Sequence, residues 1–303
     1  MMYDRLKRKL IAGETIILDG GTGTDIQAKG APMHGDTWCA EVNLTHPDIV
    51  QAVHEDYIRA GAELITANSF ASSVLSFNYY KRDADVPVID RAAVAIAKRA
   101  ADGRVPVAGS FSTMRPVHPG TDRTVTDFNW TEAEARRLFA SKARTLKDAG
   151  VDLILMEMMR DRDYSVWATE EAMATGLPVW VGISVEKDSQ GRLTGFGRED
   201  QLLEDFLPLL AGLKPDVISI MHSSPNDTSE AIPVFRRHWQ GPLGAYPESG
   251  YFAAPDWNFV DIIPPPELVA VARQWSKAGV GLLGGCCGIG PQHIAALKGE
   301  FAA

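Results

Sequence analysis

The stretch Val280-Gly281-Leu282-Leu283-Gly284-Gly285-Cys286-Cys287 joins an apolar run to a pair of cysteines, and it is the last of eight such runs in the chain. Each run is short, apolar and followed by small or polar residues, which is typical of a buried strand. The repetition predicts eight strands, within the runs Thr15 to Gly21, Ala62 to Phe70, Val105 to Phe111, Val151 to Met158, Pro178 to Val185, Asp216 to His222, Gly241 to Pro247 and Val280 to Cys287.

Amphipathic stretches lie between successive runs, and two of them have clear helix boundaries. Thr45-His46-Pro47-Asp48 opens one stretch that ends at Ala60-Gly61, and Thr131-Glu132-Ala133-Glu134 opens another that ends at Ala149-Gly150. Such residues cap the start of a helix, and glycine ends it. Strand and helix alternate without a long linker, so we expect one closed (β/α)₈ TIM barrel over residues 1–303. A doubly wound open sheet is the alternative.

Composition limits the partners of this 303-residue chain, which is 45% hydrophobic. The formal net charge of -9 argues against nucleic acid and against an anionic membrane surface. The charged residues 1–10 are followed by an apolar stretch too short for a signal peptide, and no later run could cross a bilayer. We therefore expect a cytoplasmic protein that acts on small molecules, and a homo-oligomer remains possible.

The adjacent pair Cys286-Cys287 is expected to bind a metal ion. A disulfide between neighbouring cysteines is strained, whereas two thiolates beside flexible glycines can bind one Zn²⁺. His222, at the end of the sixth run, offers a third ligand and leaves one zinc position open, as in catalytic sites. Alternatively, His222 is a hydrogen-bonded histidine at a helix-capping turn with no role in metal binding. Cys39, the third cysteine of the chain, is expected to be an ordinary buried residue.

In a TIM barrel the active site lies at the carboxyl ends of the strands. The polar residues at the ends of the runs are therefore expected to meet on one rim, and they are Asp19-Gly20-Gly21, Asn68, Ser110, Glu157, His222 and Cys286-Cys287. The long connections Met114 to Asn129 and Glu248 to Pro266 could fold over this rim.

Several motifs resemble those of the homocysteine S-methyltransferase family over Leu18 to Ile294. The most specific is the closing stretch Gly284-Gly285-Cys286-Cys287-Gly288-Ile289-Gly290-Pro291-Gln292-His293-Ile294, and Asp19-Gly20-Gly21-Thr22-Gly23-Thr24 is similar to the opening motif. Further matches are Trp38 with Pro47, His54, Tyr57 and Ala60-Gly61-Ala62, then Glu157, and then Tyr246-Pro247-Glu248-Ser249-Gly250.

The resemblance implies a TIM barrel that moves a methyl group from a small sulfonium or quaternary-ammonium donor to the thiol of homocysteine, giving methionine. The family holds zinc with three cysteines. This chain has Met221-His222 where the family reads Asn-Cys, so His222, Cys286 and Cys287 are the expected zinc ligands.

Substrate roles follow from the same resemblance. Asp19 and Glu157 are expected to bind the amino group of the acceptor, and a carboxylate after an apolar strand is costly to bury without a cation. The backbone N–H groups of Gly20 and Gly21 are expected to approach its carboxylate, and Asn68 is a further substrate-binding candidate.

Aromatic side chains are the candidates for the donor side. Trp38 could attract a desolvated cation through its indole face, and core packing is its alternative role. Phe70, Tyr246 and Trp257 could form further walls of the donor site.

Two other functions remain open. One is a divergent family member that methylates another thiol or uses another donor. The other is a non-catalytic barrel that binds a small molecule and has lost the metal. The metal content of protein purified without added zinc separates this second alternative from both enzymes.

Replacing His222 by cysteine is predicted to raise the rate of methyl transfer to homocysteine. A neutral imidazole brings one negative charge less than a thiolate, so the substrate sulfur donates more density to zinc and attacks less readily. The rate is measured for the wild-type protein and the His222→Cys variant at equal zinc content. An unchanged rate at full metal occupancy contradicts this prediction.

Overall fold

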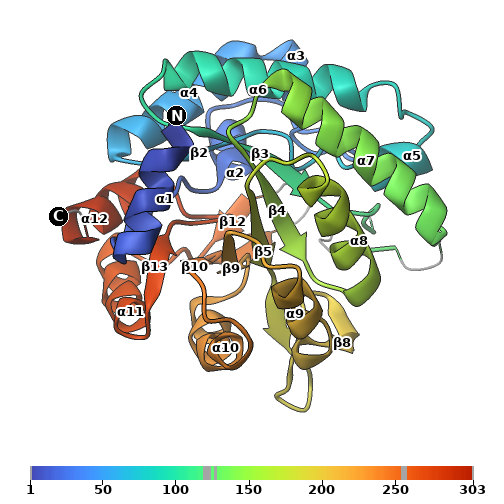
Figure 1. Ribbon diagram of the computed structural model, residues 1–303. Coiled ribbons are helices and arrows are strands. Elements are labelled where there is room, and N and C mark those ends of the chain that lie inside the picture. The colour runs from blue at the N-terminus through green and yellow to red at the C-terminus, as the bar shows by residue number, and fades with distance from the viewer. Residues whose placement is uncertain (1, 119–123, 126–127, 254–257, 302–303) are drawn as a thin grey trace.

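The structure is a computed structural model that describes residues 2–118, 124–125, 128–253 and 258–301. Its main sheet has eight parallel strands in the order β1-β13-β10-β9-β5-β4-β3-β2 (Figure 1). Every strand overlaps one of the eight predicted runs. Their bounds are β1 Ile16–Ile17, β2 Ile65–Ala67, β3 Val107–Ser112, β4 Leu153–Met159, β5 Val179–Ile183, β9 Val217–Met221, β10 Leu243–Tyr246 and β13 Val280–Leu283.

The sheet closes between its first and last strands. Leu18, just after β1, forms a parallel bridge with Leu64, just before β2. The backbone N–H of Glu63 donates to the carbonyl of Ile17 at 2.7 Å. These contacts confirm the closed TIM barrel and exclude the doubly wound open sheet.

Helices surround the strands as an outer layer (Figure 1). The two predicted boundaries are confirmed: Gly61 ends α4 in a left-handed conformation, and Thr131 with Glu134 forms a capping box before α7, which Gly150 ends. The helices are α1 Met2–Ala12, α2 Thr22–Ala28, α3 Val42–Thr45, α4 Pro47–Ala60, α5 Val74–Tyr79, α6 Val86–Ala101, α7 Glu132–Ala149, α8 Arg162–Met173, α9 Leu203–Gly212, α10 Pro225–His238, α11 Pro265–Lys277 and α12 Pro291–Phe301.

A separate apolar cluster fills the inside of the barrel and includes Leu18, Leu155, Trp180 and Leu282. Tyr3 of α1 packs on Trp180 with ring centroids 6.3 Å apart, and the indole N–H of Trp180 donates to the Tyr3 hydroxyl at 3.0 Å. Helix α1 therefore packs against the inner core, and the carboxyl ends of the strands are left to form a pocket.

Two small antiparallel sheets were not predicted. One contains β6 Val185–Lys187, β7 Leu193–Gly195 and β8 Arg198–Leu202, and it lies between β5 and α9 in the chain. The other is the hairpin of β11 Tyr251–Ala253 and β12 Asn258–Val260. These strands have three to five residues each, too few for a clear alternation of apolar and polar positions.

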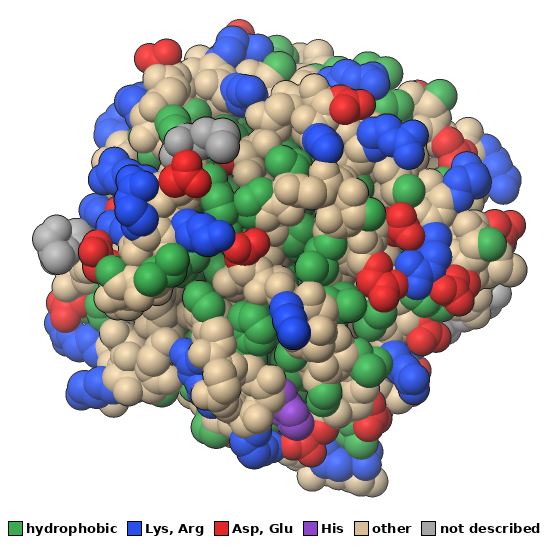
Figure 2. Space-filling view, in the orientation of Figure 1, with side chains coloured by type: hydrophobic (Ala, Val, Ile, Leu, Met, Phe, Trp, Pro, Cys, Tyr) green, Lys and Arg blue, Asp and Glu red, His purple; other side chains and the backbone are tan. Residues whose placement is uncertain are grey.

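Two observations concern the helices and the surface charge of the protein. No helix in the described part of the chain is long and apolar enough to span a membrane. On the face shown in Figure 2, acidic and basic side chains are interspersed, so this face has no broad field of positive charge.

A buried ion pair holds the loop after β2, which carries the pocket residues Asn68 and Phe70. Lys142 of α7 lies 2.9 Å from the carboxylate of Asp90 on α6, and both side chains are fully buried. The Lys142 ammonium also donates to the carbonyls of Ser69 and Ser72, at 3.0 and 3.1 Å. This one cation therefore links two helices to a wall of the pocket.

Lys142→Met is predicted to lower the free energy of unfolding by about 3–5 kcal/mol, because it leaves the Asp90 carboxylate buried without a cation. Adding Asp90→Asn removes that charge and should recover part of the loss. Urea unfolding of the three proteins measures the effect. A double variant no more stable than Lys142→Met contradicts the explanation.

Candidate metal centre and substrate pocket

One pocket at the carboxyl ends of the strands collects the side chains that the sequence placed on the rim. The structure thus confirms that they converge, although their individual roles remain predictions. The predicted residues that line the pocket are Asp19, Gly20, Gly21, Trp38, Asn68, Phe70, Ser110, Glu157, His222, Tyr246, Cys286 and Cys287.

Three of these residues form a group that could hold a metal ion. The ligand atoms of His222, Cys286 and Cys287 all lie within 4.8 Å of one another. The Sγ atom of Cys286 is 3.4 Å from Nδ1 of His222 and 4.0 Å from Sγ of Cys287, and both cysteines are free thiols. One nitrogen and two sulfur ligands suit a tetrahedral metal site, so the residues present fit the zinc ion that the resemblance implies.

The surroundings of Cys286 favour the protonated form of its thiol. The hydrogen bond from Cys286 to Cys287 and burial raise the pKa of Cys286 well above its usual value of 9.0, and His222 opposes this shift only partly. A metal ion that binds here must therefore displace the proton of this thiol.

Backbone hydrogen bonds fix the loop that carries the cysteines. The N–H of Cys286 donates to the Pro247 carbonyl at 2.8 Å, and the carbonyl of Cys287 accepts from the N–H of Ser249 at 3.0 Å. Gly288 has a φ of +78°, and a Cβ there would lie 2.2 Å from the Ser249 carbonyl oxygen. Only glycine fits this turn, which explains the residue after the two cysteines.

His222 follows β9 in a backbone conformation that non-glycine residues rarely adopt, with a φ of +43°. The next residue stabilises this turn: the Ser223 hydroxyl donates to the Met221 carbonyl at 2.8 Å and accepts from the N–H of Val185 at 2.9 Å. The Phe196 ring packs edge-on against the imidazole, with centroids 4.9 Å apart. Such unusual backbone conformations are frequent at functional sites.

Two carboxyl groups face the same pocket beside the metal group. Burial raises the pKa of Asp19 from 3.8 to about 7 and that of Glu157 from 4.5 to about 7. The Ser110 hydroxyl donates to Glu157, and Thr66 donates to Asp19 from its N–H at 2.6 Å and its hydroxyl at 3.0 Å. A bound cation would stabilise the charged form of both groups.

An irregularity in β4 lies next to Glu157. The register with β5 shifts between Met156 and Met159, and Met158 has a φ of +54°. The N–H of Met158 donates to the sulfur of Met221 at 3.2 Å rather than to a strand carbonyl. A bulge of this kind redirects side chains at a strand end.

Two residues that were expected to bind the substrate already make hydrogen bonds within the protein, and their substrate roles stay predictions. The N–H of Gly21 donates to the Ile289 carbonyl at 2.9 Å, so it is already used within the protein. A Cβ on Gly21 would lie 2.6 Å from the Cys286 carbonyl oxygen, so this glycine permits close packing of the cysteine loop. The Asn68 amide is also engaged: it donates to the Cys39 carbonyl and to Asn43, both at 3.1 Å, and accepts from the Cys39 thiol.

The hydrogen bonds of Asn68 fix the position of Cys39 and therefore of its neighbour Trp38. Burial raises the pKa of Cys39 to about 12, in agreement with an ordinary buried residue. Asn68 thus fixes the segment that presents Trp38. The Trp38 and Phe70 rings meet edge to face with centroids 6.4 Å apart, and both line the pocket.

The third aromatic candidate lies deeper than expected. Tyr246 is only 1% exposed and belongs to the cluster inside the barrel, so it forms part of the pocket floor. Its place in the donor site stays a prediction. Trp257 lies outside the described residues.

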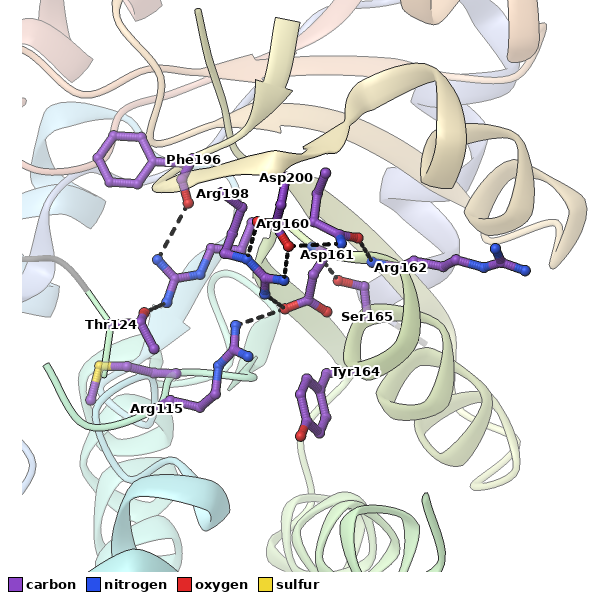
Figure 3. A network of polar contacts seen from close by, with 12 residues as sticks. Arg115, Thr124, Arg160, Asp161, Arg162, Tyr164, Ser165, Phe196, Arg198 and Asp200 are labelled. Carbon is purple, nitrogen blue, oxygen red and sulfur yellow. Dashed lines mark hydrogen bonds and ion pairs between the residues drawn. The ribbon is translucent and has the colours of Figure 1, made fainter. Parts of the chain in front are cut away.

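A cluster of arginines around Asp161 was not anticipated (Figure 3). Arg115 and Arg198 both bind the Asp161 carboxylate, at 2.8 and 3.1 Å, and they tie the end of β4 to the β6–β8 sheet. Arg160 lines the pocket and donates to the Phe196 carbonyl and to the Thr124 hydroxyl. Their position in the sequence offered the signal, because Arg160 and Asp161 lie two and three residues after the end of the fourth predicted run.

Glu248 is a further residue to which the sequence interpretation gave no role. Its carboxylate oxygen Oε2 lies 3.2 Å from Nε2 of His222, on the nitrogen that does not face the cysteines. It belongs to the connection after β10, which was expected to fold over the rim, and here it reaches the metal group.

The closed barrel and this group define a TIM-barrel protein with a cysteine–histidine site that could hold a metal ion, beside two carboxyl groups that line the same pocket. The sequence pattern that defines the homocysteine S-methyltransferase family matches residues 16–301. The chain belongs to that family.

Individual members of the family are similar to this protein over nearly the whole chain. The chain is 26% identical to homocysteine S-methyltransferase 1 of Zea mays, over 95% of this chain and 94% of the relative. It is also 26% identical to betaine–homocysteine S-methyltransferase 1 of Mus musculus, over 97% of this chain and 74% of the relative. The metallated homocysteine methyltransferase MmuM of Escherichia coli superimposes with a TM-score of 0.75 at 24% identity, over 95% of this chain and 96% of that protein.

Glu157→Gln is predicted to stabilise the metal-free protein at pH 8 but not at pH 4. The folded state holds the extra proton between pH 4.5 and about 7, so stability is lost as pH rises through that window. Allowing for partial solvent access through the pocket, we expect a gain of ~2 kcal/mol at pH 8. Urea unfolding at both pH values measures it, and equal effects at the two values contradict the assignment.

Proposed function

We propose that this protein transfers a methyl group from a small sulfonium or quaternary-ammonium donor to the thiol of homocysteine, giving methionine, with zinc as its metal. The observation that carries the proposal is the position of His222, Cys286 and Cys287 in one pocket with the carboxyl groups of Asp19 and Glu157. The pocket therefore offers one place for a thiol and another for an ammonium group.

The acceptor is bound through its charged groups. Asp19 and Glu157 face the pocket as carboxyl groups with pKa values of about 7, and an ammonium group would stabilise their ionised forms. The proposal therefore assigns the amino group of homocysteine to the region near β1 and β4. Its thiol end then points to the cysteines, because Cys286 and Cys287 line the same pocket.

His222, Cys286 and Cys287 would hold the zinc ion. Bound there, zinc would lower the pKa of a substrate thiol and so supply a thiolate nucleophile at neutral pH. The protein must then align this sulfur with the methyl carbon of the donor for an in-line displacement.

The donor is assigned to the part of the pocket that Trp38 and Phe70 line. The face of an aromatic ring attracts a desolvated sulfonium or ammonium group, worth on the order of 1–2 kcal/mol. Gly23 makes room for the indole, because a Cβ at this position would lie 2.3 Å from the Trp38 ring.

Zinc-loaded protein mixed with homocysteine and S-methylmethionine, betaine or dimethylsulfoniopropionate is predicted to form methionine, measured by mass spectrometry. Cys286→Ser and Cys287→Ser should each lower zinc affinity and rate by about 100-fold or more, because each removes a ligand. Cys39→Ser, which changes the one cysteine outside the pocket lining, is the matched control and should retain zinc.

The outcomes separate the alternatives. Bound zinc without methionine from any of the three donors points to another acceptor thiol or another donor. A protein that binds no zinc at all contradicts the proposal and favours a non-catalytic binding barrel.

A further inference from the structure

Glu248 contacts the proposed metal ligand from its outer side. Oε2 of Glu248 lies 3.2 Å from Nε2 of His222, while Nδ1 of the same ring lies 3.4 Å from Sγ of Cys286. The two ring nitrogens of an imidazole point in different directions, so Glu248 cannot replace His222 at the metal. A hydrogen bond from Nε2–H to Glu248 leaves the lone pair of Nδ1 directed at the cysteines.

The backbone around Glu248 is bonded to the other parts of the site. Its own N–H donates to the Ser223 carbonyl at 3.2 Å, next to His222. The preceding Pro247 accepts from the N–H of Cys286, and the following Ser249 donates to the carbonyl of Cys287. Because Glu248 is fixed between both ligand-bearing loops, its carboxylate can set the position of the imidazole relative to the sulfurs.

The surroundings of the pair favour a strong hydrogen bond. The side chains of His222 and Glu248 are only 8% and 16% exposed, so water competes weakly for the contact. Phe196 packs against the imidazole ring, with centroids 4.9 Å apart, and limits its rotation. The ring is therefore constrained by an aromatic contact and by a carboxylate on Nε2.

We propose that Glu248 is a positioning residue of the metal site: it fixes His222 with Nδ1 toward the cysteines and supplies, through the imidazole, the negative charge that a third thiolate would bring. This inference rests on the proposed function, because it requires a metal at His222, Cys286 and Cys287. A carboxylate on the outer nitrogen of a ligating histidine makes the ring a better donor, and its loss typically costs 10–100-fold in metal affinity.

A double-mutant cycle on zinc affinity tests the proposal. The dissociation constant is measured by competition with a chromophoric chelator for the wild-type protein, Glu248→Gln, His222→Cys and the double variant. Glu248→Gln should weaken binding by about 10–100-fold when His222 is present. In the His222→Cys background, Glu248→Gln should cause no loss of zinc affinity. A thiolate has no N–H that needs a hydrogen-bond acceptor, and a neighbouring carboxylate repels its negative charge.

Glu230→Gln is the matched control, since Glu230 pairs with Lys187 at 2.5 Å on the surface and neither residue lines the pocket. It should leave zinc affinity unchanged. The absorption spectrum of the cobalt-loaded protein is the second readout. Its d–d and thiolate charge-transfer bands should move in Glu248→Gln and return toward the wild-type positions in Glu248→Asp, which keeps the charge.

Each outcome is decisive. If the wild-type protein binds neither zinc nor cobalt, the proposed function fails and the inference fails with it. If it binds both and Glu248→Gln behaves like Glu230→Gln, the inference alone is overturned. An equal loss in the wild-type and His222→Cys backgrounds also overturns it, because Glu248 would then support only the loop. If Glu248→Gln does not fold, Glu248→Ala takes its place in the cycle: cobalt bands and zinc affinity equal to those of the wild-type protein overturn the inference, and shifted bands with weaker zinc binding support it.

Discussion

The barrel closes through β1, a strand of only two residues, and the rest of the structure depends on that seam. On one side Leu18 donates to the Leu283 carbonyl at 2.8 Å, and on the other it bridges Leu64. The cysteine loop adds bonds from Gly285 to the Asp19 carbonyl at 3.0 Å and from Gly21 to the Ile289 carbonyl at 2.9 Å. The peptides that close the barrel therefore also hold the metal group.

This sharing explains why some residues have two roles. Asp19 faces the pocket, yet Thr66 on the far side of the seam donates to both of its carboxylate oxygens. The Ile289 carbonyl accepts from Gly21 and also from the Tyr57 hydroxyl of α4, at 3.2 Å. A substitution at these positions changes the closure of the barrel along with the site, so loss of activity there does not by itself identify a substrate contact.

The sequence was sufficient to predict the eight barrel strands and the residues at their carboxyl ends, because both follow from local patterns. Buried parallel strands are continuous apolar runs, and parallel strands bring their carboxyl ends to one edge, so Asp19, Glu157, His222 and Cys286 had to converge. Hydrogen-bond partners do not follow from such rules. The acceptor for Gly21 is Ile289, at the other end of the chain, and the contact between Glu248 and His222 depends on the path of a loop. The short β6–β8 strands carry too few residues for a periodic signal.

The raised pKa values in the pocket suggest that the metal and the substrate amine bind in the same way, each by displacing a proton. Cys286, Asp19 and Glu157 all have raised pKa values, so near neutral pH the pocket carries less negative charge than it would if these groups had their ordinary pKa values. Each cation that binds displaces a proton and creates its own counter-charge: the metal at the Cys286 thiol, the ammonium group at the carboxyls. Electrostatic repulsion among these three groups is thereby reduced while neither the metal nor the substrate amine is bound. Binding of the metal and of the substrate amine should both strengthen as pH rises, because both release protons.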